Sequence, residues 1–186
     1  MERVVLKAIQ NGIAIYATHT ALDNSNVGVS AKMCEVLGLK NQKILIQKED
    51  ESIGMGMIGT LETEMTEEDF LNHLKKTMKT DCIRHSKLLG KPIKKVAVLG
   101  GSGSFAISNA IRANADIYVT SDLKYHEFFK AENKLVLADI GHYESEQFTK
   151  NLLVDHLTKK ITNFAPALPT GKIVLSENNT NPIYYR

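Results

Sequence analysis

The chain has 186 residues, of which 43% are hydrophobic and 24% charged, and its formal net charge is +2. This length suffices for one sizeable α/β domain or two small lobes. The near balance of acids and bases gives no argument for a nucleic acid or an anionic membrane as partner. The two cysteines form no CxxC motif, and no leader or membrane-spanning stretch stands out, so we expect a cytoplasmic protein.

Helices and strands are expected to alternate along the chain. Apolar residues at helical spacing predict helices over residues 2–11, 26–37, 66–78, 104–115, 123–132 and 143–161. Short apolar runs predict strands over residues 13–17, 43–46, 95–100, 116–120, 134–141 and 173–175, the last closing the sheet. Residues 47–59 are expected to form a Gly-rich, charged connection. This order predicts a layered α/β architecture with substantial parallel pairing.

An internal repeat is suggested by residues 7–23 and 130–146, which align at a constant offset. Both segments consist of a helix, a strand, a His-xxx-acid motif and a second helix. Chance remains an alternative, since any two strand–loop–helix units share an apolar strand. If the repeat is real, the first copy lacks the strand–helix–strand unit that precedes the second. We therefore expect the first copy to be truncated at the N-terminus.

The GHYESE segment carries the strongest local motif. His142 and Glu146 are four residues apart at the start of a helix, which places them on one helical face at the end of a strand. An imidazole and a carboxylate suit Zn, Mn, Fe or Co. The alternative is an exposed pair without function.

Two further His–acid pairs have the same spacing and also follow strands. His19 and Asp23 occupy the repeat-equivalent positions, with a loop histidine and a capping aspartate as the alternative. Asp122 and His126 would form an acid–base pair or supply a further metal ligand, and Asp122 would equally serve as a helix cap. The GGSGS segment precedes a helix, where a Gly-rich turn can bind phosphate. The match to a phosphate-binding loop is weak, because the Walker and Rossmann spacings are absent, so a tight turn is favoured.

Long segments resemble a known family. The stretch AVLGGSGSFAISNAIRANADIYVTSDLKYHEFF, followed by LADIGHYESEQ, closely resembles the C-terminal half of the GTP cyclohydrolase 1 type 2-like, dinuclear-metal-centre (Nif-three-like) family. YATHTALDNSNVGVSAKMCEVLGL resembles its middle segment. The resemblance implies an α/β fold of two similar lobes with mixed, partly parallel sheets flanked by helices. It also implies a toroidal homohexamer with two metal ions per subunit.

The resemblance also assigns site residues. Asp23, His142 and Glu146 fall on metal-ligand positions, and His19 falls on a binding position near them. Asp122 and His126 match the polar positions that we expect to act in catalysis by proton transfer.

Two departures from the family pattern reduce what this chain is expected to do. The family's WDN-type and His-His-Pro motifs are absent, and so is an inserted domain at a short junction, 47–55. We expect one family domain over 1–186, with a partial first lobe at 1–50 and a second lobe at 56–186. The resemblance implies a metal-dependent hydrolase of the kind that opens the purine ring of GTP. We expect fewer bound ions (Zn, Fe, Mn or Co) than the two per subunit of the family. A non-enzymatic ring-shaped scaffold and a nucleotide-binding regulator are the alternatives.

Overall fold

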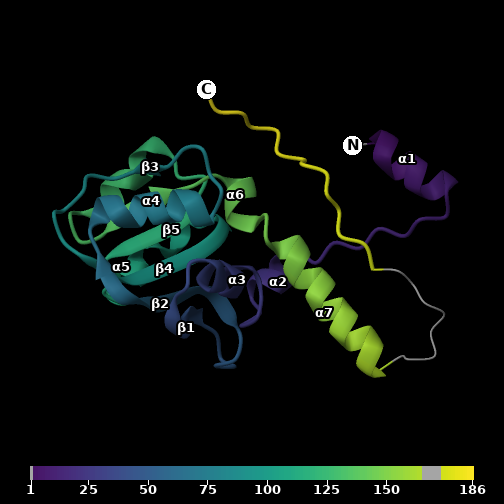
Figure 1. The fold of residues 1–186 in the computed structure, drawn as a ribbon, viewed down its shortest axis with the longest axis horizontal. Coiled ribbons are helices and arrows are strands. Elements are labelled where there is room, and N and C mark those ends of the chain that lie inside the picture. Colours follow the sequence, from purple (N-terminus) through teal and green to yellow (C-terminus); the bar gives the residue numbers. More distant parts are fainter. Residues whose placement is uncertain (1, 165–172) are drawn as a thin grey trace.

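The computed structural model of the chain describes residues 2–164 and 173–186 (Figure 1). Its strands form one six-stranded sheet in the order β1-β2-β4-β5-β6-β3. The strands are β1 (Lys40–Gln47), β2 (Gly54–Met65), β3 (Arg84–His85), β4 (Ile93–Ser102), β5 (Ile117–Ser121) and β6 (Val136–Asp139). β4, β5 and β6 run parallel, whereas β1, β2 and β3 pair antiparallel with their neighbours. The predicted mixed, partly parallel α/β fold is therefore confirmed.

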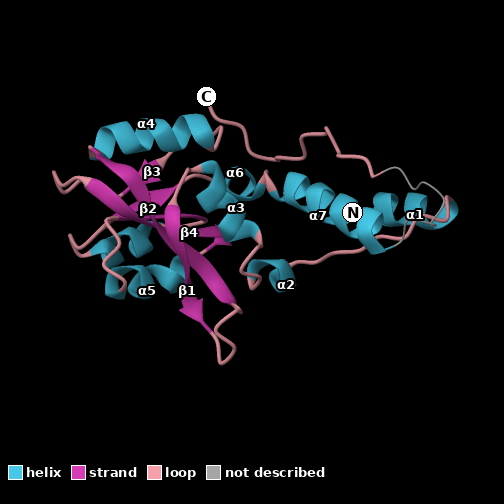
Figure 2. Ribbon diagram, turned by 60° about the horizontal axis from the view of Figure 1, so that its bottom comes forward, coloured by secondary structure: helices cyan, strands magenta, loops and turns pink. Residues whose placement is uncertain are grey.

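Helices cover both faces of the sheet (Figure 2). They are α1 (Glu2–Gln10), α2 (Thr20–Asp23), α3 (Val29–Val36), α4 (Glu67–Thr77), η1 (Ser104–Ala106), α5 (Ile107–Arg112), η2 (Tyr125–Ala131), α6 (His142–Glu146) and α7 (Thr149–Phe164). Along β4, Val96 and Val98 face the core beneath α3 and α4, whereas Ala97 and Leu99 face the core beneath α5 and η2. This two-sided burial explains the continuous apolar run in β4.

Two predicted strands are wrong. Residues 13–17 pair with no strand in the described part of the chain, and Ile13, Ile15 and Tyr16 are 61%, 63% and 88% exposed. Residues 173–175 are likewise unpaired, and Val174 is 72% exposed. Both segments have strand-like sequences, but a strand forms only beside a partner that accepts its hydrogen bonds. Together with α1 and α7 they stand apart from the sheet (Figure 1).

Three further predictions need correction. The connection expected at 47–59 is largely the strand β2, whose glycines allow close packing, since a Cβ on Gly54 would lie 2.1 Å from the carbonyl oxygen of Ile46. The helix expected over residues 26–37 begins only at Val29.

The single helix predicted over 143–161 is two helices, α6 and α7. Between them the side-chain amide of Gln147 donates to the carbonyl oxygen of Met78 at 2.7 Å. Phe148 packs against the core at the same break.

The helix predicted after Thr66 is confirmed as α4, because the Thr66 hydroxyl accepts from the backbone N–H of Asp69 at 3.1 Å. All described strands, β1 included, lie in one sheet, so the division into two lobes stays a prediction. Among the described residues, no helix combines the length and apolarity that crossing a membrane requires.

Candidate metal centre

Three loops meet at one edge of the sheet. They follow β4, β5 and β6, which are parallel neighbours, so their carboxyl ends lie side by side. Gly101 lies at the end of β4 just before the first loop, the second loop begins with Asp122, and the third leads through Gly141 into α6. Ligands of open α/β sheets bind at such an edge.

The imidazole of His142 links two of the predicted acids. Its Nδ1 lies 2.6 Å from Oδ2 of Asp122, and its Nε2 lies 3.6 Å from Oε1 of Glu146. Because a carboxylate only accepts, Nδ1 carries the proton toward Asp122. In the neutral ring this leaves the lone pair on Nε2, on the side of Glu146. A carboxylate behind a histidine is the arrangement that orients metal-binding imidazoles.

A cavity of about 390 Å³ brings in the predicted N-terminal pair. Its wall includes His19 and Asp23 together with His142 and Glu146. Leu22, Val29, Met55, Leu99 and Phe105 supply apolar surface in the same wall. The structure therefore unites four of the six predicted site residues around one space and holds a fifth, Asp122, against His142.

Burial and mutual repulsion shift the pKa values of these groups. Burial raises the pKa of Asp23, and the positive charges of His19 and His142 oppose the shift. Burial also raises the pKa of Glu146, assisted by the charge of Asp23. Burial works to lower the pKa of His142, but the hydrogen bond to Asp122 and the surrounding carboxylates raise it overall. A bound cation would relieve the repulsion between the crowded carboxylates.

The donor set fits one divalent ion in part. Two ligands of a tetrahedral zinc lie about 3.3 Å apart, since each bond is about 2 Å long. Nε2 of His142 and Oε1 of Glu146 are separated by 3.6 Å, close to that value. Within residues 2–164 and 173–186, however, no group of three or more His, Cys, Asp or Glu side chains is assembled closely enough to hold an ion. Asp23 would have to move toward the other two.

Buried polar atoms without partners lie in the cavity wall or next to site residues in the sequence. In the described part of the chain, the buried side-chain atoms lacking a hydrogen bond are Asn24 Oδ1, Ser121 Oγ and Thr149 Oγ1. Thr149 lines the cavity, and the other two adjoin Asp23 and Asp122 in sequence. Such atoms usually find water or a ligand.

Asp139, which sequence reasoning did not single out, ties the loops together. Its Oδ2 accepts from the backbone N–H of Leu123 at 2.8 Å and pairs with Arg84, and its Oδ1 accepts from the backbone N–H of Gly141 at 3.1 Å. The two backbone groups flank Asp122 and His142 in sequence, so one buried carboxylate sets the position of both. An acid ending an otherwise apolar strand was the available signal.

Gly101 explains the GGSGS segment, which serves close packing. Its φ is +70°, and a Cβ at this position would lie 2.6 Å from Oε1 of Glu146. Its backbone N–H donates to the hydroxyl of Ser145 at 2.9 Å, and that hydroxyl donates to the carbonyl of His142 at 2.8 Å. The favoured tight turn is not what forms here, because residues 100–102 belong to an irregularly paired end of β4 that packs against α6.

His126 is the predicted site residue that the structure leaves apart. It is exposed on η2, where its ring meets the edge of Tyr125 with 5.2 Å between ring centroids. It is absent from the wall of the cavity that holds the other residues.

The profile of one family, Duf34/NIF3 (NGG1p interacting factor 3), matches residues 1–182. The chain belongs to this family. A "GTP cyclohydrolase 1 type 2 homolog" of Clostridium perfringens is 33% identical over 149 residues, covering 77% of this chain and 56% of the relative. One of Staphylococcus epidermidis is 38% identical over 144 residues, covering 77% of this chain and 38% of the relative. The chain thus spans about half the length, or less, of these relatives.

Solved structures share the fold. The Staphylococcus aureus protein SA1388 superposes with a TM-score of 0.89 at 25% identity, covering 98% of this chain and 73% of that one. Reduced HcgD from Methanocaldococcus jannaschii gives a TM-score of 0.64 at 29% identity, covering 82% and 59%. The superposition on SA1388 takes in nearly the whole chain, so it includes the segments that stand apart from the sheet.

Proposed function

We propose that this chain is a divalent-metal-dependent hydrolase with reduced metal occupancy. The observation that carries the proposal is the 3.6 Å separation of His142 Nε2 and Glu146 Oε1 beside a cavity that Asp23 also lines. His142 and Glu146 would hold one ion of Zn, Mn, Fe or Co, and Asp23 would supply a further ligand. A bound ion would lower the pKa of a coordinated water toward neutrality.

Other residues of the chain would orient the metal ligand and exchange protons with the substrate. Asp122 fixes the ring of His142 through the bond to Nδ1. His19, in the cavity wall, is placed to exchange a proton with a substrate there. His126 would act only on a substrate that extends beyond the cavity. The name that these relatives share, GTP cyclohydrolase 1 type 2 homolog, supports a purine nucleotide such as GTP as substrate.

The experiment is elemental analysis of bound metal per chain. We expect less than one ion, lost in Asp23→Asn and Glu146→Gln and kept in Glu49→Gln, an exposed carboxylate outside the cavity. Loss of the purine absorbance of GTP, dependent on added metal, would then report activity. No metal in any form would contradict a metal site, and two ions per chain would contradict reduced occupancy.

A non-enzymatic role as a scaffold is the second candidate, and one observation favours it. Val4, Leu6 and Ile9 on α1 are 66%, 55% and 72% exposed, and Ile13 and Tyr16 continue this apolar surface along the chain. Exposed apolar patches mark interaction sites. A homohexameric ring, as the family resemblance implies, would cover it. Light scattering of the chain and of Ile9→Glu tests this, since a monomer in both would contradict self-association.

A further inference from the structure

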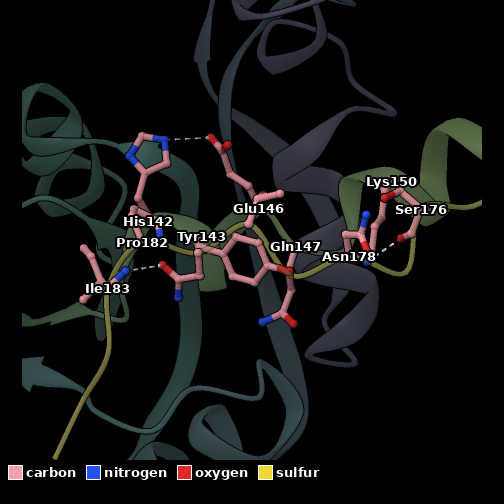
Figure 3. A pocket seen from close by; sticks show the side chains of 11 residues that line it. His142, Tyr143, Glu146, Gln147, Lys150, Ser176, Asn178, Pro182 and Ile183 are labelled. Atoms are coloured by element: carbon pink, nitrogen blue, oxygen red, sulfur yellow. Dashed lines mark hydrogen bonds and ion pairs between the residues drawn. The ribbon is translucent and has the colours of Figure 1, made fainter. Parts of the chain in front are cut away.

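A second cavity, of about 500 Å³, also has His142 and Glu146 in its wall (Figure 3). It lies where α6 and the start of α7 face the C-terminal segment 176–183. Its volume falls within the range of pockets that hold small molecules. The shared wall means that a molecule in this cavity reaches the same two side chains that we propose as metal ligands.

Two hydrogen bonds hold the C-terminal segment over α6 and α7. Lys150 Nζ donates to the carbonyl oxygen of Ser176 at 2.9 Å. Asn181 donates from its side-chain amide to Oε1 of Glu144 at 2.8 Å, and Glu144 is itself only 6% exposed. The C-terminal segment forms one wall of the cavity, α6 and α7 form the other, and these two hydrogen bonds connect them.

Lys150 gives this cavity a positive charge without a carboxylate partner. In the part of the chain that the structure describes, Lys150 forms no ion pair, and its ammonium group donates only to the neutral carbonyl of Ser176. Two of its three N–H donors remain free. The side chains of Asn178 and Thr180, which line the same cavity, also form no hydrogen bond to described residues. Several donors around one cation suit an oxyanion.

The residues divide between the two ends of the cavity. Figure 3 shows Lys150 with Ser176 and Asn178 at one end and His142 at the other, with the ring of Tyr143 between them. A ligand that spans the cavity would meet a cation, then an aromatic surface, then the proposed metal ligands.

We propose that this cavity binds a small organic anion, with its phosphate or carboxylate at Lys150 and its reacting group at His142 and Glu146. The inference rests on the proposed hydrolase and adds the substrate class and the residue that selects it. Lys150 touches the substrate but takes no part in the chemistry.

Calorimetric titration of the metal-supplemented chain tests this binding. Guanosine monophosphate probes the phosphate, benzoate the carboxylate, and uncharged guanosine is the comparator. We expect one of the anions to bind. Lys150→Met should weaken that binding about tenfold, the loss for one partly solvated charge-assisted hydrogen bond. Lys150→Arg should restore most of it.

Lys159→Met is the matched control, because Lys159 is an exposed lysine of the same helix outside the cavity. It should bind the anion as the unchanged chain does. Equal affinities of Lys150→Met and Lys159→Met for the anion that binds, binding of guanosine as tight as that of this anion, or binding of neither anion at 10 mM (roughly the weak limit of useful affinity) would each overturn the inference.

Metal content measured on the same samples separates this inference from the proposed function. Normal metal content with binding that does not depend on Lys150 would contradict the anion cavity alone. Absence of metal with binding that depends on Lys150 would contradict the hydrolase and keep the cavity as a binding site.

Discussion

Oδ2 of Asp122 lies 2.6 Å from Nδ1 of His142, although the two residues are 20 positions apart in the chain. The bond crosses from the loop after β5 to the helix after β6. Asp122 has a positive φ of 58°, a conformation that aspartate and asparagine tolerate better than most residues. The proposed metal ligand is therefore oriented by a neighbour whose own backbone is specialised.

Replacing Asp122 by asparagine should weaken metal binding about 10- to 100-fold, the usual effect of losing such a partner behind a histidine ligand. Asparagine keeps the backbone conformation, so the fold should remain. Competition with a chromophoric chelator measures the affinity. Asp50→Asn, on an exposed loop, is the control, and equal affinity in the two variants would show that Asp122 does not orient His142.

Asp139→Asn should lower both stability and metal affinity. The change removes the negative charge that pairs with Arg84, and it weakens the hydrogen bonds that Asp139 accepts from the backbone N–H groups of Leu123 and Gly141. We expect it to lower the free energy of unfolding by about 1–3 kcal/mol. Urea unfolding and metal titration measure the two effects.

Asp116→Asn is the matched control for Asp139→Asn. Asp116 also accepts two backbone N–H groups, from Lys94 and Lys95, but lies away from the cavity. It should lose stability without losing metal affinity. Equal losses of metal affinity in both variants would mean that Asp139 acts only through general stability.

Gly101→Ala should abolish metal binding. The new methyl group would lie 2.6 Å from Oε1 of Glu146 in a backbone with φ of +70°. Gly38→Ala isolates the backbone effect, because Gly38 has φ of +73° and nothing within 4 Å of a new Cβ. Gly38→Ala should cost about 1 kcal/mol of stability and keep its metal. Normal metal binding by Gly101→Ala would refute the close approach of the Gly101 backbone to Glu146.

One cysteine should react with thiol reagents in the folded protein. Cys34 is buried, and burial raises its pKa to about 12, so it stays protonated and unreactive at pH 8. Cys82 is exposed. Mass spectrometry after maleimide treatment should find one label in native protein and two after denaturation. Two labels on the native protein would show that the core around Cys34 opens readily.

The sequence predicts the parallel strands β4, β5 and β6 well because they are largely buried on both faces, whereas it misses β2 and β3. The apolar runs within β4, β5 and β6 are shorter than a typical helix, which identifies them as strands, and Thr66 marks the start of α4. The strands expected at 13–17 and 173–175 fail, since composition reveals a preference for extended backbone but no partner. The glycines of β2 predict a loop, whereas in the structure they allow close contact between strands.

The site was predictable only where residues are neighbours in sequence. The spacing of His142 and Glu146 placed them on one helical face, and the structure has them 3.6 Å apart. The roles of Asp139 and Ser145 depend on hydrogen bonds to residues 16 and 44 positions away, which no local pattern encodes. His126 shows the converse, because correct spacing from Asp122 did not bring it to the cavity.

The first cavity draws its wall from widely separated parts of the chain: residues 18–29, 55, 99–105 and 142–149. These parts come together only when the sheet and both of its helical layers have formed. A partly folded chain therefore has no such site, and any ion bound there would favour the folded state by mass action. The amount of metal that a preparation binds at saturation would then measure how many of its molecules have completed folding.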